Sequence, residues 1–81
     1  MSIMIALKSI KVNRDKITCV AYVEDCHTPI SLSFDRQKKK IDTFQLPAGY
    51  EWCTSHIHHA EKYFCTAEKN ELPQERTIMW C

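Results

Sequence analysis

Residues 53–67 read CTSHIHHAEKYFCTA, and this stretch decides the fold class because its apolar side chains recur with a helical period. The positions that lie three or four residues apart and would form one apolar stripe are Cys53, Ile57, Ala60, Phe64 and Ala67. Such a stripe is typical of a helix that lies with one face on a sheet. We therefore predict one amphipathic helix that covers a sheet built from the rest of the chain.

The ends of this helix are marked by residues that favour helix boundaries. Thr54 or Ser55 can accept hydrogen bonds from the first free backbone N–H groups. Lys69 suits the negative end of the helix dipole, and Asn70 followed by Pro73 favours a stop. The predicted helix thus has about four turns.

The residues before the helix alternate between apolar and polar side chains, which is the period of β-strands. The predicted strands cover residues 3–12, 16–24, 30–34 and 40–46, with turns between them. In the first strand the apolar positions change phase, which predicts a β-bulge near Lys8 and Ser9. Pro47 and Gly49 then end the fourth strand.

The C-terminal residues 76–81, RTIMWC, are rich in residues that favour strands, so we expect a fifth strand that returns to the sheet. The resulting order, ββββαβ, predicts an α+β fold with an antiparallel meander of about four strands, one long helix on the sheet and a short last strand. A chain of 81 residues has room for a single core, so we expect one domain over residues 1–81.

The composition is that of an ordinary globular protein, with 44% hydrophobic and 26% charged residues. No apolar run reaches the roughly 20 residues that a membrane-spanning helix needs, and we find no secretion signal. We therefore expect a cytoplasmic protein that makes no membrane contact. Five cysteines are an odd number for a disulfide framework, so we expect free thiols. The net charge of +1 creates no strong overall field toward nucleic acid.

The densest group of reactive side chains lies where the helix begins. Cys53, His56 and His59 follow one another at three-residue spacing, which would allow two or three of them to hold zinc. Cys26 or Cys81 would then supply a further ligand. The second pair of closely spaced ligands that strong zinc motifs contain is missing. The alternative interpretation is that Cys53 packs in the core while His56 and His59 border it.

Cys53 is also the best candidate for a nucleophile. A thiol at a helix start meets the positive end of the helix dipole, which lowers the thiol pKa, and His56 would help to keep the thiolate. The sequence offers no third partner for this pair, no glycine-rich turn for an oxyanion hole, and no nucleotide-binding or hydrolase motif. We therefore expect neither an enzyme nor a cofactor.

A basic tract forms the predicted hairpin tip between the third and fourth strands. Its cations are Arg36, Lys38, Lys39 and Lys40. Such a patch can contact the phosphates of nucleic acid. Asp35 and Asp42 flank the tract, and no aromatic side chains are interleaved to stack on bases. We expect a solvated hairpin tip, with nucleic-acid binding as the alternative.

Large aromatic side chains lie in the loop before the helix and at the end of the chain. Tyr50 and Trp52 occupy the loop, and Trp80 follows Met79 in the last strand. Side chains of this kind either close a core or form the centre of a protein interface. We expect a small non-catalytic binding or adaptor domain that acts through protein–protein contacts at the open face or an edge strand of the sheet. Homodimerisation through the last strand is its simplest form.

Overall fold

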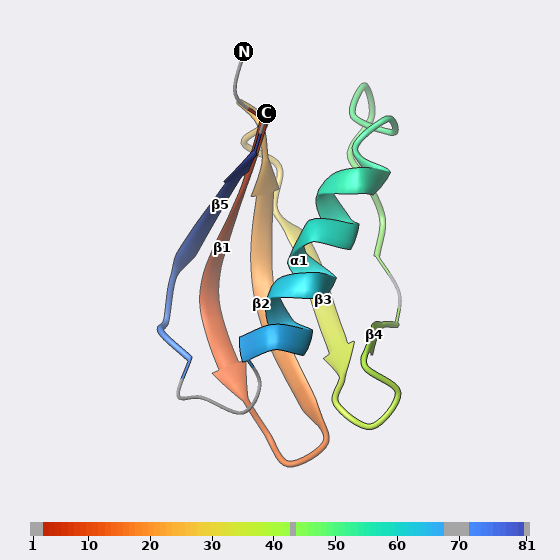
Figure 1. Ribbon diagram of the computed structural model, residues 1–81. Helices are drawn as coiled ribbons and strands as arrows, with labels where there is room; N and C mark the ends of the chain where they lie inside the picture. Colours follow the sequence, from red (N-terminus) through yellow and green to blue (C-terminus); the bar gives the residue numbers. More distant parts are fainter. Residues whose placement is uncertain (1–2, 43, 68–71, 81) are drawn as a thin grey trace.

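The computed structural model describes residues 3–42, 44–67 and 72–80, and it confirms the α+β class and the order ββββαβ. The elements are β1 (Ile3–Val12), β2 (Lys16–Val23), β3 (Ile30–Asp35), β4 (Lys40–Ile41), α1 (Thr54–Ala67) and β5 (Arg76–Trp80). The five strands form one antiparallel sheet in the order β4-β3-β2-β1-β5. The sheet curls into half a barrel, and α1 lies across its inner side (Figure 1). Among the described residues no helix is long and apolar enough to cross a membrane.

The predicted bulge in β1 is confirmed. The pairing of β1 with β2 shifts between Lys8 and Lys11, and Ser9 has a positive φ of 53°. The extra residue reverses the phase of the strand, so that Leu7 before the bulge and Ile10 after it are both buried. The bulge thus keeps both halves of a ten-residue strand facing the same core.

The core lies between the inner face of the sheet and the predicted stripe of α1. Cys53, Ile57, Ala60 and Phe64 are all buried, as the helical spacing predicts. The rings of Phe64 and Phe34 on β3 have their centroids 5.5 Å apart, which packs the helix against β3. The helix begins at Thr54 as expected. Lys69 and Asn70, which we expected at its end, lie outside the described residues.

The predicted fourth strand is a correction, because β4 covers residues 40–41 and not 40–46. Asp42 N–H still donates to Ser33 O at 2.9 Å, and the chain then leaves β3. The outer side of β4 is occupied by the helix, since Ile41 N–H donates to the Glu61 carboxylate at 2.9 Å. A turn at residues 47–50, closed by the bond from Tyr50 N–H to Pro47 O, then leads into α1.

Candidate functional site at the β5 edge

One side of β5 pairs with β1, and its other side is an edge of the sheet. Along an antiparallel strand the backbone groups of successive residues point alternately to the two neighbouring strands. Met4 O accepts the N–H of Glu24 on the β2 side, so the backbone groups of the next residue, Ile5, point to β5, where Ile5 is the partner of Ile78. By the same alternation, Thr77 and Met79 direct their backbone N–H and C=O groups away from the sheet. Four strand-pairing groups therefore point outward from this edge.

The side chains of β5 divide between the two faces of the sheet. Ile78 and Trp80 lie on the inner face, where both are half-buried against the core. Met79 lies on the outer face and is 63% exposed, which is unusual for a large apolar side chain. Arg76 contributes the one charge of this strand, and its guanidinium lies 5.6 Å from the centroid of the Tyr63 ring. The edge is thus nearly uncharged and partly apolar.

The opposite edge of the sheet is protected along the two residues of β4. Its strand, β4, is two residues long, and the helix lies alongside it. Glu61 of α1 accepts the outward N–H of Ile41, and the Cys65 thiol donates to Lys39 O at 3.5 Å. A short strand whose outward groups bond to a helix gives no template for pairing.

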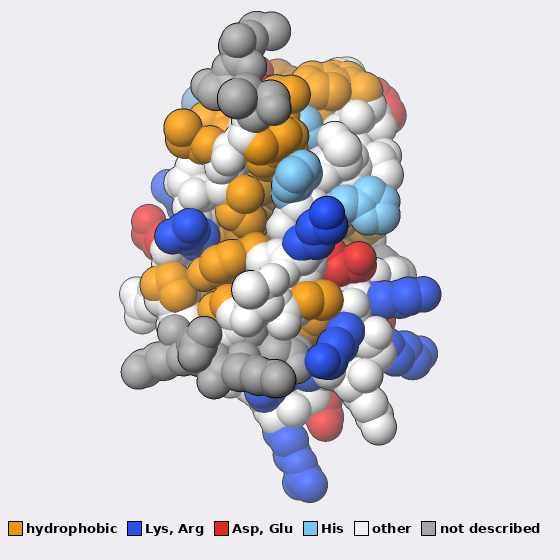
Figure 2. All heavy atoms as spheres, viewed as in Figure 1, with side chains coloured by type: hydrophobic (Ala, Val, Ile, Leu, Met, Phe, Trp, Pro, Cys, Tyr) orange, Lys and Arg blue, Asp and Glu red, His pale blue; other side chains and the backbone are white. Residues whose placement is uncertain are grey.

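Four rings form an aromatic corner beside the β5 edge, namely Trp52, His56, His59 and Trp80. His56 is fully buried and lies edge-on to both tryptophans, with ring centroids 5.4 Å from Trp52 and 5.0 Å from Trp80. His59 stacks on Trp80 at 3.8 Å with an interplanar angle of 19°. Trp52 is 60% exposed. Figure 2 shows hydrophobic side chains gathered beside histidines at this end of the molecule.

A carboxylate from the turn after β2 holds the buried histidine in place. His56 Nε2 lies 2.7 Å from Glu24 Oε2, and the same oxygen accepts Met4 N–H at 2.8 Å. The hydrogen bonds from His56 and from Met4 lower the pKa of Glu24. Glu24 has a positive φ of 52°. This contact ties β1, β2 and α1 together at the aromatic corner.

The structure does not assemble the metal cluster that the sequence spacing allows. His56 Nε2 is taken by Glu24, and His59 lies flat on Trp80. Within residues 3–42, 44–67 and 72–80 no group of three or more histidine, cysteine, aspartate or glutamate side chains converges as a metal site. Cys81, one of the two further ligands considered, lies outside these residues. The His56 Nδ1 atom is buried and has no hydrogen-bond partner among the described residues.

Cys53 differs from an activated nucleophile. It is fully buried, and burial raises its pKa, with the nearby charge of Glu24 acting in the same direction. Burial and the charge of Glu24 thus act against the activation of this thiol that we considered from the sequence. The expectation that Cys53 packs in the core is confirmed.

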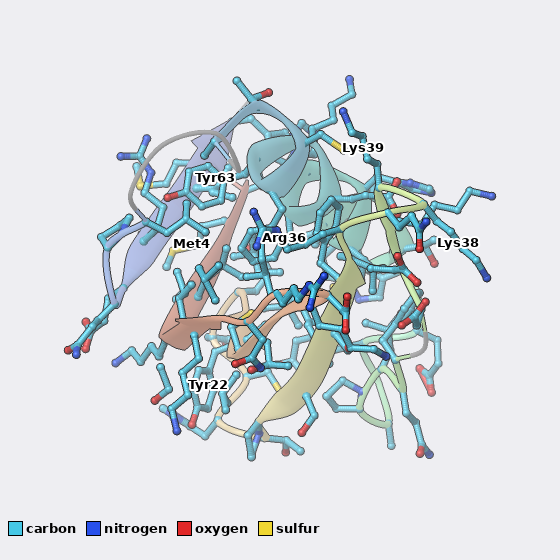
Figure 3. All side chains as sticks on the ribbon, turned by 90° about the horizontal axis from the view of Figure 1, so that it is seen from below. Met4, Tyr22, Arg36, Lys38, Lys39 and Tyr63 are labelled. Carbon is cyan, nitrogen blue, oxygen red and sulfur yellow. The ribbon has the colours of Figure 1, made fainter. Side chains whose placement is uncertain are left out.

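The basic tract lies at the tip of the β3–β4 hairpin, where Lys38 and Lys39 project from the molecule (Figure 3). Arg36 turns back to the neighbouring hairpin and donates from Nη1 to Asn13 O at 2.7 Å. Asp35 caps the turn by accepting the N–H groups of Gln37 and Lys38, both at 2.9 Å. These contacts give Arg36 a structural role, while the exposed side chains of Lys38 and Lys40 remain on the surface.

The residues predicted for partner binding lie at one end of the molecule. Trp52 and Trp80 flank His56, whereas Tyr50 donates its hydroxyl to Asp25 Oδ1 at 2.7 Å. This bond raises the pKa of Tyr50 to about 12. Tyr50 therefore braces the loop, and the exposed ring of Trp52 is the one free to contact a partner.

Two residues important for this arrangement were missed by sequence reasoning. Glu24 orients His56 across 32 positions of sequence, and Glu61 covers Ile41 across 20. The sequence feature that could have drawn attention to Glu24 is a carboxylate at the end of an apolar strand, and this feature does not identify His56 as its partner.

Comparison with known proteins does not add a relative, because no family model, no curated protein and no solved structure matches this chain. Its function must be inferred from the geometry of the edge and of the aromatic corner.

Proposed function

We propose that this protein is a small binding module that acts through protein–protein contacts by adding a strand to the β5 edge. The observation that carries the proposal is the contrast between the outward backbone groups of Thr77 and Met79 and the covered N–H of Ile41 on the other edge. Proteins normally protect such edges with charges, bulges or covering elements, and an unprotected one is a site for strand pairing. Exposed Met79 and Trp52 supply side-chain contacts next to it.

A second copy of this chain is the simplest partner. Two antiparallel β5 strands related by a two-fold axis at Ile78 would place Thr77 opposite Met79 of the partner subunit, and the reverse. In this register the outward groups of both strands bond to each other, which gives four main-chain hydrogen bonds. The sheet would then continue through both subunits.

The side chains of β5 are self-complementary in this register. On the inner face Ile78 would meet the partner's Ile78, and Arg76 would meet the partner's Trp80. The second pairing is cation–π and occurs twice by symmetry, each instance contributing roughly 0.5 to 1 kcal/mol. On the outer face Thr77 and Met79 make an uncharged pair. No like charges face each other, which supports the two-fold arrangement.

Proline at Met79 tests this proposal. The N–H of Met79 points away from β1, so Met79→Pro removes an outward donor without breaking the ladder to β1. Met79→Thr is the matched control, because it shortens the side chain and keeps the N–H. Light scattering across a concentration series should show twice the mass of one chain for the unaltered protein and for Met79→Thr, and the mass of one chain for Met79→Pro. A monomeric unaltered protein, or a Met79→Pro variant that still dimerises, would refute the proposal.

Nucleic-acid binding is the second candidate, and one observation favours it. Arg36 bonds to Asn13 through its guanidinium and to Asp15 through its backbone N–H, which brings two hairpin tips together and sets Arg14 near Arg36 and Gln37, next to Lys38 in the sequence. Replacing Lys38 and Lys40 by glutamate should then abolish binding to a duplex oligonucleotide and flatten its salt dependence. Binding that is unchanged in this variant would eliminate the hairpin as the nucleic-acid site.

A further inference from the structure

A cavity of about 620 Å³ lies between β3 and residues 44–48, on the side of β3 that β4 leaves uncovered. Its near wall contains Pro29 and Ser31, and its far wall contains Phe44, Leu46 and Pro47. Figure 1 shows the chain after β4 running alongside β3 toward the start of α1. The cavity therefore occupies the place where the predicted fourth strand would have continued.

The backbone of Ser31 faces this cavity. Ser33 O accepts Asp42 N–H on the β4 side, so alternation along β3 directs the N–H and C=O of Ser31 to the same side. The next pairing position on the opposite segment is Phe44, and among the described residues no hydrogen bond joins Phe44 to Ser31. One donor and one acceptor of an interrupted strand ladder thus line the cavity.

The walls define what the cavity accepts. None of the described residues that line it carries a charge. Phe44 is 39% exposed and Leu46 is half-buried, so the far wall offers apolar contact to a side chain that enters. Main-chain groups on one wall and uncharged side chains on the other match a short extended peptide.

We propose that β3 takes up a short, uncharged, extended segment of another protein, which pairs with Ser31 and packs against Phe44 and Leu46. The occupant is a different chain and not a second copy, because the β5 strand that a second copy would offer carries Arg76, whereas the cavity is uncharged. Pairing the β5 of one copy with the β3 of the next would also build an open filament. This site is independent of the β5 edge, since the two lie on opposite sides of β2 and β1.

The test uses one peptide and two proline variants. The probe is the blocked hexapeptide acetyl-TVTVTV-amide, and its control carries N-methyl groups on alternate valines, which removes the donors needed for pairing. Ser31→Pro removes the N–H that faces the cavity and leaves the bonds of β3 to β2 intact. Met79→Pro alters the other edge and serves as the matched control.

The expected result is saturable binding of the unmethylated peptide, measured by the amide resonance of Ser31, with slower hydrogen exchange at that amide in the complex. Ser31→Pro should weaken binding, measured by titration of the labelled peptide, by about tenfold or more, as expected for one to two main-chain hydrogen bonds. Met79→Pro should bind the peptide with unchanged affinity, even if it is monomeric. A failure of peptide binding at β3 is therefore distinguishable from a failure of dimerisation at β5. A Ser31 amide that is already protected in the free protein, equal binding of the methylated peptide, or no binding would each overturn the inference.

Discussion

The two edges of this sheet are built in opposite ways. At β4 the strand ends after two residues, and Glu61 from the helix accepts the outward N–H of Ile41. At β5 the strand runs for five residues, and Thr77 and Met79 direct their groups outward beside a partly apolar surface. The difference teaches that a single helix can cover one edge strand of a half-barrel while the strand on the other edge keeps its outward backbone groups. Our proposal for β5 rests on this difference.

Among these predictions, removing the Phe64 ring that packs α1 on the sheet should lower the free energy of unfolding the most. Phe64→Ala deletes a fully buried ring in contact with Phe34, and it should lower the free energy of unfolding by about 4 kcal/mol. Thr66→Ala on the exposed side of α1 is the control and should change it by less than about 0.5 kcal/mol. Urea unfolding measures both. A loss below about 1 kcal/mol for Phe64→Ala would mean that the helix does not hold the core together.

Glu24 fixes β1, which in turn carries β5, so its loss should loosen the open edge. Glu24→Ala leaves His56 Nε2 and Met4 N–H without their shared acceptor and should cost on the order of 2 kcal/mol in unfolding free energy. Circular dichroism during urea unfolding checks this value. An unchanged midpoint would show that water replaces the carboxylate at no cost.

The same residue predicts a pH dependence. The pKa of Glu24 is lowered in the folded protein, chiefly by the hydrogen bond from His56 and then by that from Met4, while partial burial and, to a smaller extent, the charge of Asp25 oppose the shift. The ionised carboxylate therefore contributes its full stability above its ordinary pKa of 4.5. That contribution is lost as the pH falls below 4.5 toward the lowered value. Unfolding midpoints measured from pH 6 downward should fall less steeply for Glu24→Gln than for the unaltered protein, and equal slopes would contradict the assignment.

The cover on the β4 edge can be removed by one substitution. Glu61→Ala leaves the N–H of Ile41 without its acceptor, which should cost about 1.5 kcal/mol and speed hydrogen exchange at that amide. Glu61→Gln keeps an acceptor oxygen and should retain most of the protection. If exchange at Ile41 is as slow in Glu61→Ala as in the unaltered protein, the helix is not what closes this edge.

The smallest predicted effect concerns the turn that leads from β4 to the helix. Gly49 has a φ of 86°, and its N–H donates to the Glu51 carboxylate at 2.9 Å. Gly49→Ala should cost about 1 kcal/mol, because an alanine is strained at that φ although open space surrounds the site. Ala48→Gly, one residue earlier, is the control and should change stability by less. The midpoint of thermal unfolding measures both variants, and an unchanged midpoint for Gly49→Ala would show that alanine is tolerated at this φ.

Much of the fold could be predicted because it depends on local periods. The stripe from Cys53 to Phe64 predicts the buried face of α1, and the change of phase at Lys8 and Ser9 predicts the bulge. The length of β4 could not be predicted in this way. Residues 40–46 favour a strand locally, but Glu61 competes for the edge after the chain has folded back.

Only part of the aromatic corner could be expected from the sequence. Trp52 and Trp80 were recognised as interface candidates, yet their common contact with His56 depends on packing between residues far apart in the sequence. The buried His56 bonds to Glu24, and no short-range sequence pattern connects these two residues. Cys53 and His59 have a spacing that suits metal ligands, but Cys53 is buried in the core and His59 stacks on Trp80.

Disulfide cross-linking at Ile78 tests most directly whether β5 is a self-pairing edge. On the proposed two-fold axis, Ile78 lies opposite the partner's Ile78 in a pair with a Cα separation of roughly 4.5 Å, which suits a disulfide. Ile78→Cys in a Cys81→Ser background should form a covalent dimer under mild oxidation, and Thr77→Cys in the same background should not. A dimer that forms in solution without the Ile78 cross-link would place the interface elsewhere. Equal cross-linking of both variants would contradict the register.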